Sequence, residues 1–306
     1  MPRIYFIIVT YNAMKWAERC FSSLRKSSTP LQVIVVDNGS TDGTQEFIKS
    51  NFPEVELIQS PENLGFGKAN NLGIELAYKN GAEFFYLMNQ DAWIFEDTVQ
   101  KLINFYENYH NKVEIGILSP IHLDGSEKKL EIFVEKYLGT NAFKDRIFTD
   151  LLLNQNRKYF ELDFINAAHW FLPKDTVEKV GGFNPYFFHY GEDNEYVNRL
   201  RYKEKKTFLI KDCFAVHDGK QELGKVDYSR YTDTSIDTNI LDPNHHFTPE
   251  EFAKSLKKAI LKNALTGNFQ QAKNQRTALK RIQSNSNELK KLKKILSTSP
   301  HPFLNL

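Results

Sequence analysis

The first 120 residues alternate between short apolar runs and longer segments with helical periodicity. The apolar runs span residues 4–10, 32–37, 55–59, 84–88 and 115–119. Between them, apolar side chains recur at helical spacing over residues 14–26, 43–51, 68–79 and 97–109. Strands and helices thus alternate, and short segments with Gly, Asn or Pro separate them. This pattern predicts an α/β fold with a mostly parallel central sheet and helices on both faces.

Length and composition favour one large domain with an appendage. The chain has 306 residues, of which 41% are hydrophobic and 25% charged, as is usual for a globular protein. The N-terminal apolar run has only six residues, so it predicts neither a signal peptide nor a membrane span. Cys20 and Cys213 are far apart and lack metal-ligand spacing, which argues against a disulfide framework or a zinc cage and favours a reducing cytoplasm.

Polar residues directly follow three of the predicted strands. In sheets of this kind, ligands bind outside the carboxyl ends of the strands, so these residues are candidates for a binding site. They are Thr10, Tyr11 and Asn12 after the first strand, Asp37, Asn38, Gly39 and Ser40 after the second, and Asn89, Gln90 and Asp91 after the fourth.

Asp37 ends its strand just before a turn and a helix start. Its carboxylate can accept the N3 hydrogen of a uracil or thymine ring, whereas cytosine has no such hydrogen. The alternative is that Asp37 and Asp42 only cap the turn and the helix, and for Asp42 we prefer that interpretation.

Residues 63–73 place small residues and amides at a helix start, where free backbone N–H groups can bind a diphosphate. A capped helix start without a ligand would show the same pattern. The segment is not a dinucleotide fingerprint, which needs Gly-x-Gly-x-x-Gly after the first strand, and it is not a Walker loop, which needs Gly-Lys followed by Ser or Thr. The candidate residues are Asn63, Gly65, Phe66, Lys68, Asn70 and Asn71.

Carboxylates suited to metal binding or proton transfer occur at two further places. Asp91 follows a buried strand, and a hard divalent cation that bridges two phosphates needs one or two such carboxylates. Capping of the next helix is the alternative.

Glu192, Asp193 and Glu195 follow an aromatic run, where desolvation raises a carboxyl pKa and makes a better base. An acidic helix start stabilised by the helix dipole is the alternative there. His217, after a short apolar strand, is of interest only as a partner for a metal.

Six short motifs follow one another in a fixed order between residues 3 and 219. They are Thr10-Tyr11-Asn12, residues 36–43 (VDNGSTDG), Asn63 through Asn71, Asn89-Gln90-Asp91, residues 181–193 (GGFNPYFFHYGED) and Ala215-Val216-His217. In this order and spacing they resemble the inverting glycosyltransferases of family 2, which have the GT-A fold, and in particular their rhamnosyl- and galactofuranosyltransferase-like branch.

Departures from the family pattern concern the acceptor. The Asp of Gly-Gly-Phe-Asp is Asn184, and the second Asp of Glu-Asp-x-Asp is Glu195. Trp170 places a large ring where the acceptor is expected to pass. We therefore expect Trp170 and Glu192 on the acceptor side, and an unusual acceptor.

The resemblance implies a metal-dependent transfer of a sugar from a UDP- or dTDP-sugar to a hydroxyl of a saccharide or lipid-linked saccharide in cell-surface polysaccharide synthesis. Residues 1–220 would form the catalytic domain, with a donor half over about residues 1–120 and an acceptor half over about residues 121–220. A nucleotidyltransferase or a dehydrogenase is disfavoured, because no glycine-rich loop follows the first strand.

The same resemblance assigns roles to single residues. Thr10, Asn12 and Asp37 would bind the base, and Asp91 and His217 would hold Mn²⁺ or Mg²⁺. Asp193 would remove the acceptor proton. The alternative is a non-catalytic nucleotide-sugar-binding protein of the same fold, because asparagines replace acids in two motifs.

Residues 221–306 are predicted to form a linker and a basic helical extension. Residues 247–306 contain twelve Lys or Arg against three Glu, although the whole chain has a net charge of only +2. Thr248, Pro249 and Glu251 predict a capped helix start.

We expect the helix from Pro249 to pack on the catalytic domain, and the basic residues 284–297 to contact an anionic membrane at the inner face. A solvated helix face is the alternative. Residues 219–246 are expected to be irregular and residues 297–302 to fray. No nucleic acid partner is expected.

Overall fold

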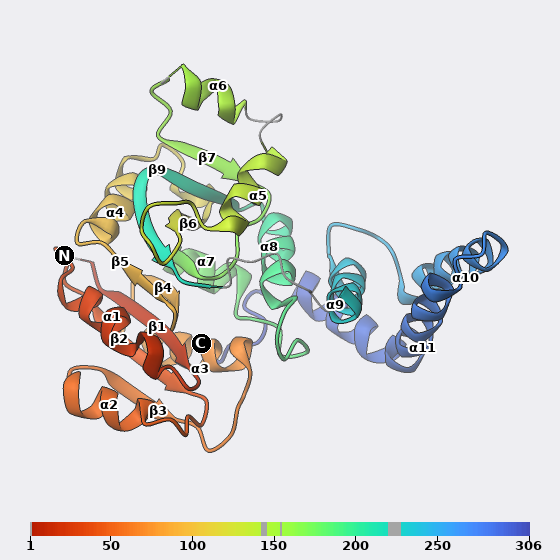
Figure 1. Cartoon of the computed structure of the whole chain (residues 1–306), viewed down its shortest axis with the longest axis horizontal. Helices are drawn as coiled ribbons and strands as arrows, with labels where there is room; N and C mark the ends of the chain where they lie inside the picture. Colours follow the sequence, from red (N-terminus) through yellow and green to blue (C-terminus); the bar gives the residue numbers. More distant parts are fainter. Residues whose placement is uncertain (1, 142–145, 154, 220–227) are drawn as a thin grey trace.

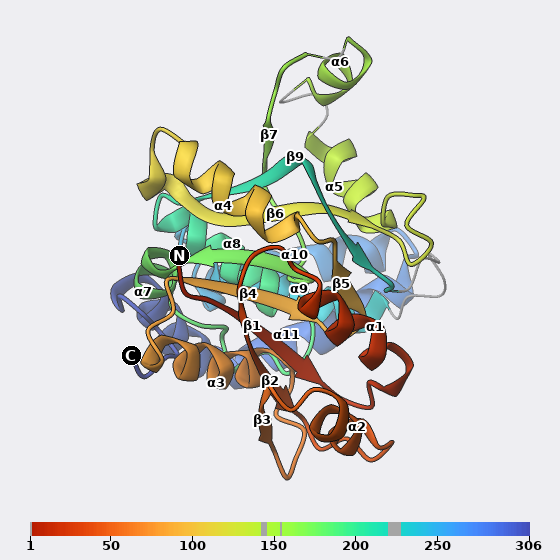
Figure 2. The same ribbon diagram turned by 90° about the vertical axis from the view of Figure 1, so that its left-hand side faces the viewer.

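A computed structural model of the chain describes residues 2–141, 146–153, 155–219 and 228–306. Nine strands form one sheet, in the order β3-β2-β1-β4-β8-β6-β9-β5, and β7 pairs with β9. Figures 1 and 2 show this sheet with helices on both of its faces and the C-terminal helices to one side. The predicted α/β class with a C-terminal helical extension is confirmed. The predicted boundary after residue 220 falls where the described residues stop, so it remains a prediction.

The N-terminal half contains the parallel part of the sheet. Its parallel strands are β1 (Ile4–Thr10), β2 (Gln32–Asp37), β3 (Glu56–Gln59) and β4 (Phe84–Asn89). Its helices are α1 (Met14–Arg25), α2 (Thr44–Asn51), α3 (Phe66–Lys79) and α4 (Thr98–Asn108). Each of these elements was predicted from periodicity to within two residues at either end.

Beyond β4 the sheet is mixed. Its strands are β5 (Ala92–Ile94), β6 (Ile115–Leu123), β7 (Tyr159–Leu162), β8 (His169–Pro173) and β9 (Lys206–His217). β8 is antiparallel to β4 and β6, whereas β9 is parallel to β6 and antiparallel to β5 and β7. The helical segments are the 3₁₀ turn Lys112–Glu114, α5 (Ile132–Asn141), α6 (Ile147–Leu152), α7 (Lys174–Val180) and α8 (Glu192–Tyr202). The weak periodicity of residues 120–165 did not predict α5, α6 or β7.

Two hydrophobic clusters cover the two faces of the sheet. Because successive side chains of a strand point to opposite faces, Ile7 lies in one cluster and Ile8 in the other. Both side chains are fully buried. Burial of each such side chain contributes about 1.5–3 kcal/mol to folding, so the sheet is a rigid support for the loops at its edge.

Three helices form the C-terminal extension: α9 (Tyr228–Leu241), α10 (Pro249–Leu265) and α11 (Phe269–Thr298). The predicted capping box is confirmed, since Thr248 accepts from the Glu251 N–H and the Glu251 carboxylate accepts from the Thr248 N–H. The expectation that residues 219–246 are irregular is wrong for α9.

The packing of the last two helices is the reverse of the expected one. α10 packs mainly along α11, and α11 also contacts α8 and α9. Leu289 and Leu296 of α11 are fully buried, so the apolar stripe of residues 284–297 packs within the protein. These leucines therefore cannot form the membrane contact predicted for that segment.

The residues after α11 bind to the α/β body of the protein instead of fraying. The C=O of Pro302 accepts a hydrogen bond from the Gly182 N–H at 2.9 Å, and the Phe303 C=O accepts one from Asn71 Nδ2 at 3.3 Å. Leu304 is buried in the main core, beside α3. The chain end accordingly lies next to α3 in Figure 1.

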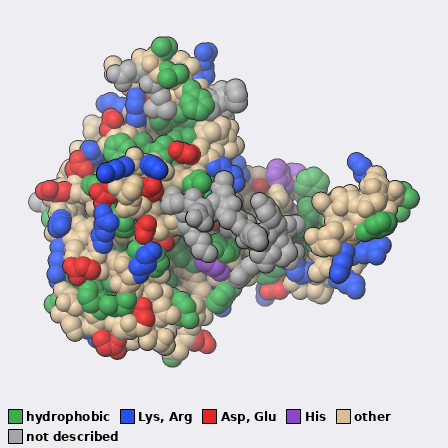
Figure 3. Space-filling view, viewed as in Figure 1, with side chains coloured by type: hydrophobic (Ala, Val, Ile, Leu, Met, Phe, Trp, Pro, Cys, Tyr) green, Lys and Arg blue, Asp and Glu red, His purple; other side chains and the backbone are tan. Residues whose placement is uncertain are grey.

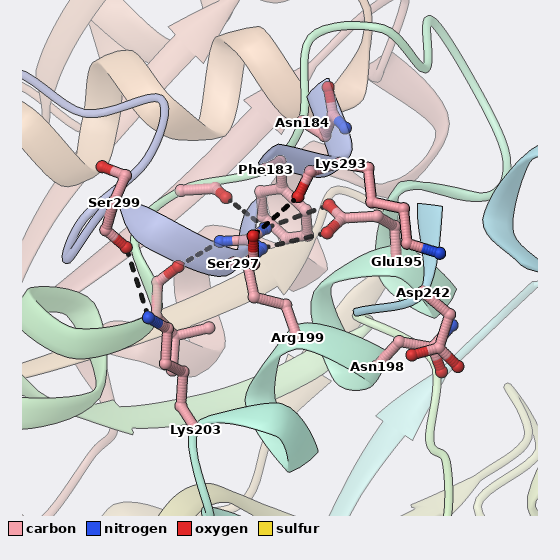
Figure 4. Close-up of polar contacts among 12 residues, drawn as sticks. Phe183, Asn184, Glu195, Asn198, Arg199, Lys203, Asp242, Lys293, Ser297 and Ser299 are labelled. Carbon is pink, nitrogen blue, oxygen red and sulfur yellow. Dashed lines mark hydrogen bonds and ion pairs between the residues drawn. The ribbon is translucent and has the colours of Figure 1, made fainter. Parts of the chain in front are cut away.

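A buried ion pair attaches α8 to the segment before it. Arg199 binds Glu195 through two hydrogen bonds of 3.0 Å, and both side chains are fully buried. The same guanidinium donates to the backbone C=O groups of Val180 and Gly182. Figure 4 shows Arg199 beside Glu195. Glu195 thus has a structural role, as in the alternative that we gave for the acidic helix start. Its partner is the Arg199 side chain and not only the helix dipole.

We expect Glu195→Gln to lower the free energy of unfolding by about 3 kcal/mol or more, because the Arg199 charge would remain buried without a counter-charge. Urea denaturation measures this change. Glu107→Gln is the matched control, since Glu107 pairs with Lys112 at the surface and such pairs contribute at most about 1 kcal/mol. Equal losses in the two variants would contradict a special role for the buried pair.

Candidate active site

The strand register brings three of the predicted motifs to one edge of the sheet. β1 pairs in parallel with β2 and β4, with Thr10 opposite Asp37 and Val9 opposite Asn89. The loops that follow these three strands therefore begin side by side. The site is built at the carboxyl edge, as expected for a sheet of this type.

Asp37 is fully buried and accepts hydrogen bonds only from groups of its own loop and its neighbours. The Thr10 hydroxyl donates at 2.7 Å and the Ser40 hydroxyl at 2.6 Å. The backbone N–H groups of Gly39 and Ser40 donate at 3.1 and 2.8 Å, and Gln45 Nε2 donates to the same carboxylate. A base that binds to Asp37 must therefore replace one of these donors, of which the Gln45 side chain is the most easily moved.

The loop after β1 is held by its own polar side chains. The Gln90 amide brackets the backbone of Tyr11, accepting from its N–H at 2.7 Å and donating to its C=O at 3.2 Å. Asn12 adopts a left-handed conformation, with φ of 52°, and its Oδ1 accepts from the Thr41 N–H. The Tyr11 side chain is 48% exposed. Gln90 and Asn12 thus fix the loop, and Tyr11 presents a ring on which a base can stack.

Among the described residues no side chain caps the start of α3, so its first backbone N–H groups remain for an anion. Asn63 Oδ1 accepts from the Gly65 N–H at 2.9 Å, and Gly65 has a φ of +79°. A Cβ at Gly65 would lie 2.4 Å from the backbone oxygen of Phe188, so only glycine fits between the two loops. Lys68 is exposed, in the first turn of α3.

Two asparagines of the same motif have structural partners. Asn70 Nδ2 donates to the Phe66 C=O at 3.0 Å. Asn71 accepts from the Phe183 N–H at 2.7 Å and donates to the Phe183 C=O at 2.8 Å. Because its amide binds the Gly-Gly-Phe segment, Asn71 is not free for the donor as expected; it joins α3 to the segment that precedes α8.

Asp91 and His217 meet at the edge although they are far apart in the sequence. β5 pairs with the end of β9, with Ala92 opposite His217, so His217 Nε2 lies 3.5 Å from Asp91 Oδ1. Asn89 Nδ2 lies 3.3 Å from the same nitrogen. The Asp91 side chain is 21% exposed, and the structure thus brings together the two residues predicted to hold a metal.

A third acidic group in this cluster was missed by the sequence reasoning. Glu131, fully buried, places Oε1 3.3 Å from His217 Nδ1. Burial lowers the pKa of His217, but hydrogen bonds to Asp91 and Glu131 outweigh it and raise that pKa to about 9. Burial raises the pKa of Asp91, yet its contacts with His217 leave it below the ordinary value. Glu131 stands in no motif, and only the tertiary structure reveals it.

The donor set of this cluster fits a divalent cation. Ligand atoms of His122, Glu131 and His217 all lie within 4.8 Å of one another. At the other ring nitrogen of His217, Nε2 faces the partly exposed carboxylate of Asp91. Imidazole and carboxylate ligands suit Mn²⁺, and carboxylates with phosphate oxygens suit Mg²⁺. Asn89 Oδ1 is buried with no protein partner among the described residues, which leaves one further oxygen for such an ion.

Two adjacent carboxylates lie at the start of α8. Glu192 is 95% buried, and its Oε2 has no partner among the residues that the structure describes. Asp193 is partly exposed, and its Oδ1 accepts from the Asn194 N–H at 2.8 Å. Burial raises the pKa of both, and the negative charge of Asp193 raises that of Glu192 further. Asp193 therefore ionises first, while Glu192 retains its proton at neutral pH.

Trp170 does not line the acceptor side as expected. Its side chain is fully buried, stacks on Phe183 with centroids 5.7 Å apart and contacts Tyr196 at 5.2 Å. The ring belongs to the core beneath α8. Glu192, by contrast, faces the start of α3, since a Cβ at Gly67 would lie 3.9 Å from the Glu192 Cβ.

This arrangement agrees with a comparison against known families. Residues 5–175, more than half of the chain, match the family model of glycosyl transferase family 2. The chain belongs to this family. It is therefore a glycosyltransferase, and sugar transfer from a nucleotide carrier is its class of reaction.

Curated relatives of this glycosyltransferase are also similar in sequence. An uncharacterised glycosyltransferase of Haemophilus influenzae is 30% identical over 178 residues, which cover 55% of the chain and 68% of that protein. The dTDP-rhamnosyl transferase RfbF of Shigella flexneri is 26% identical over 70% of the chain and 68% of its own length. Glycosyltransferase GlyA of Streptococcus pneumoniae is 26% identical over 77% of the chain but only 33% of its own length.

Solved structures share the fold of the glycosyltransferase at low sequence identity. TarS 1–349 of S. aureus in complex with UDP-GlcNAc has a TM-score of 0.58 and 16% identity, over 96% of the chain and 86% of that structure. Mannosyltransferase PcManGT from Pyrobaculum calidifontis, in complex with GDP-Man and Mn²⁺, has a TM-score of 0.54 and 15% identity, over 97% and 87%.

We expect Gly65→Ala to weaken the binding of UDP at least tenfold, as measured by titration calorimetry, because its Cβ would push the Phe188 loop away from α3. Gly43→Ala is the matched control: Gly43 has a φ of +91°, but a Cβ there would meet nothing within 4 Å. Gly43→Ala carries the strain of a left-handed residue, about 1–2 kcal/mol. Gly65→Ala carries backbone strain as well, because a φ of 79° with a ψ of 173° is a conformation that essentially only glycine adopts. A loss of UDP affinity of the same size in both would show that strain, and not the contact between the loops, matters.

Proposed function

We propose that this glycosyltransferase transfers a sugar from a UDP- or dTDP-sugar to a hydroxyl of a saccharide or lipid-linked saccharide, with inversion and with Mn²⁺ or Mg²⁺. The observation that carries the proposal is the Asp91–His217 contact at the same sheet edge as Asp37 and the loop after β1. The names of relatives, among them a dTDP-rhamnosyl transferase and an O-antigen chain rhamnosyltransferase, support a deoxysugar donor and a role in polysaccharide synthesis.

The base of the donor binds between Tyr11 and Asp37. Tyr11 stacks on the ring, and Asp37 accepts the N3 hydrogen after the Gln45 side chain moves aside. This exchange keeps the buried carboxylate fully hydrogen-bonded in both states. Selectivity against cytosine follows, because a cytosine N3 would face the carboxylate with a lone pair.

The diphosphate lies between the start of α3 and the Asp91 cluster. Free N–H groups at the start of α3 and the Lys68 ammonium bind its oxygens on one side. Asp91 and His217 would hold the cation on the other side. A cation held there would supply positive charge against the negative charge that develops on the leaving diphosphate.

Glu131 is the residue that orients His217. By accepting a hydrogen bond from Nδ1–H, it leaves Nε2 as the ring nitrogen that faces Asp91, as carboxylates commonly do behind metal-binding histidines. A cation bound at Nε2 would displace the proton that this nitrogen otherwise shares with Asp91. Glu131 is itself fixed by the Val134 N–H, which donates to its Oε2 at 3.2 Å.

Asp193 acts as the general base. Its carboxylate takes the proton of the acceptor hydroxyl while the oxygen forms its bond to the anomeric carbon and the bond to the diphosphate oxygen breaks. The neutral Glu192 beside it adds no repulsion toward the donor phosphates and can donate a hydrogen bond to the acceptor. A group in this position contributes about 10²–10⁴-fold to the rate.

We expect Asp91→Asn to abolish saturable Mn²⁺ binding in the presence of UDP, measured by electron paramagnetic resonance, because the anionic ligand is removed. Glu131→Gln should weaken Mn²⁺ binding by about 10–100-fold while UDP affinity without metal is unchanged. Sugar transfer should stop in EDTA and return with Mn²⁺. Full turnover in chelator, or wild-type Mn²⁺ affinity in Asp91→Asn, would contradict the metal role.

We expect the transfer rate to fall on acidification through a pKa well above about 3.9, the value of an ordinary aspartate. The base must be ionised, and burial raises the Asp193 pKa, so activity is present above this pKa and lost below it. Rates measured from pH 4.5 upward test the acid limb.

Asp193→Asn should lower the rate by roughly 10²-fold or more, remove this acid limb and leave UDP affinity unchanged. A nearly unchanged rate would transfer the role to Glu192. Donor binding without transfer or hydrolysis of any sugar nucleotide, in the wild-type protein, would favour a non-catalytic binding protein.

A further inference from the structure

α10 and α11 form a helical hairpin that extends away from the catalytic body (Figure 1). Gly267, with φ of +79°, lies in the turn between the two helices. We call residues 254–281 the hairpin arm and its far end, residues 261–269, the hairpin tip. Among the described helices, none is long and apolar enough to cross a membrane.

The hairpin arm is cationic throughout. It contains eight basic residues and no Asp or Glu; in fact no acid occurs between Glu251 and Glu288. Arg281 pairs with Asp237 at the base of the arm, but within the described part of the chain the other seven have no carboxylate within 4 Å. The seven are Lys254, Lys257, Lys258, Lys262, Lys273, Arg276 and Lys280.

The hairpin tip exposes large apolar side chains among these cations. Leu261 is 63% exposed, Leu265 80% and Phe269 70%. Leu261 and Leu265 are four residues apart and so share one face of α10. Figure 3 shows hydrophobic and basic side chains together at this end of the molecule.

The combination identifies the chemistry of the partner. Basic side chains alone would suit any polyanion, but a phosphate backbone offers nothing to exposed leucines. A second copy of the arm would present the same positive charge and repel the first. An anionic lipid surface satisfies both features, because lysines remain at the headgroups while leucine and phenylalanine enter the acyl boundary.

We propose that the hairpin tip docks on an anionic lipid bilayer, with Leu261, Leu265 and Phe269 inserted and the arm lysines at the headgroups. The surface differs from residues 284–297, whose leucines are buried. The inference deepens the proposed function and rests on it in one respect: docking would keep the active site near a lipid-linked acceptor.

The test is co-sedimentation of the full chain with vesicles of phosphatidylglycerol and of phosphatidylcholine at low salt. We expect binding to phosphatidylglycerol only, and at least tenfold weaker binding for the triple variant Leu261→Ser, Leu265→Ser, Phe269→Ser. Lys257→Gln with Lys258→Gln and Lys262→Gln should also weaken binding. The matched control is Leu152→Ser with Leu153→Ser, which removes two exposed leucines of α6 and its C-cap and should change nothing.

Several results would overturn the inference. The inference fails if the wild-type protein does not bind phosphatidylglycerol vesicles, or if the triple variant binds them as well as the wild type does. It also fails if the Leu152/Leu153 control loses as much vesicle binding as the triple variant. A wild-type protein that self-associates through the hairpin tip, but does not bind vesicles, would likewise contradict it. A thermal shift with UDP verifies that each variant is folded. Because sugar transfer to a soluble acceptor is measured separately, vesicle binding without transfer refutes only the proposed function, and transfer without vesicle binding refutes only the docking.

Discussion

The parallel pairing of β1 with β2 and β4 is the constraint on which the site depends. Its register sets Thr10 opposite Asp37 and Val9 opposite Asn89, so three loops begin from one edge. The fully buried aliphatic residues of these strands hold that register, since a slip by one residue would turn their side chains to the other face. The loop that we propose to bind the base, and Asp91, which we propose as a metal ligand, are therefore positioned by the core and not by the loops themselves.

A second set of contacts couples the catalytic segment to the rest of the chain. Asn71 binds Phe183 from α3, Arg199 binds Gly182 from α8, and Pro302 binds Gly182 from the C-terminal tail. The segment of residues 182–183, which leads toward α8, is thus held from three sides. This convergence explains why the tail packs against the body, and it links the C-terminal extension to the segment before Asp193, the general base that we propose.

Local patterns in the sequence were sufficient for much of this structure. Periodicity predicted the strands and helices of the N-terminal half, and the capping box predicted the start of α10, because both signals depend on neighbouring residues. The search for polar residues directly after predicted strands found Asp37 and Asp91, because ligands of such sheets bind outside the carboxyl ends of the strands.

Other features depend on long-range pairing and could not be found in this way. Glu131 reaches His217 only through the fold, and the burial of Trp170 follows from its pairing in β8 between β4 and β6. The fixed tail arises from partners more than 100 residues away, such as Gly182. The hydrogen bonds to Asp37 likewise come from three side chains and two backbone N–H groups, which only the folded loops bring around one carboxylate.

The central claim is that a nucleotide diphosphate and a cation bind together at the carboxyl edge of this sheet. A crystal structure of the protein with UDP and Mn²⁺ would test it most directly. We predict an ion bound to Asp91 and His217 and to the diphosphate oxygens, with the uracil against Tyr11 and its N3 facing Asp37. A nucleotide bound away from the loops after β1 and β2, or an ion that contacts neither Asp91 nor His217, would contradict the account.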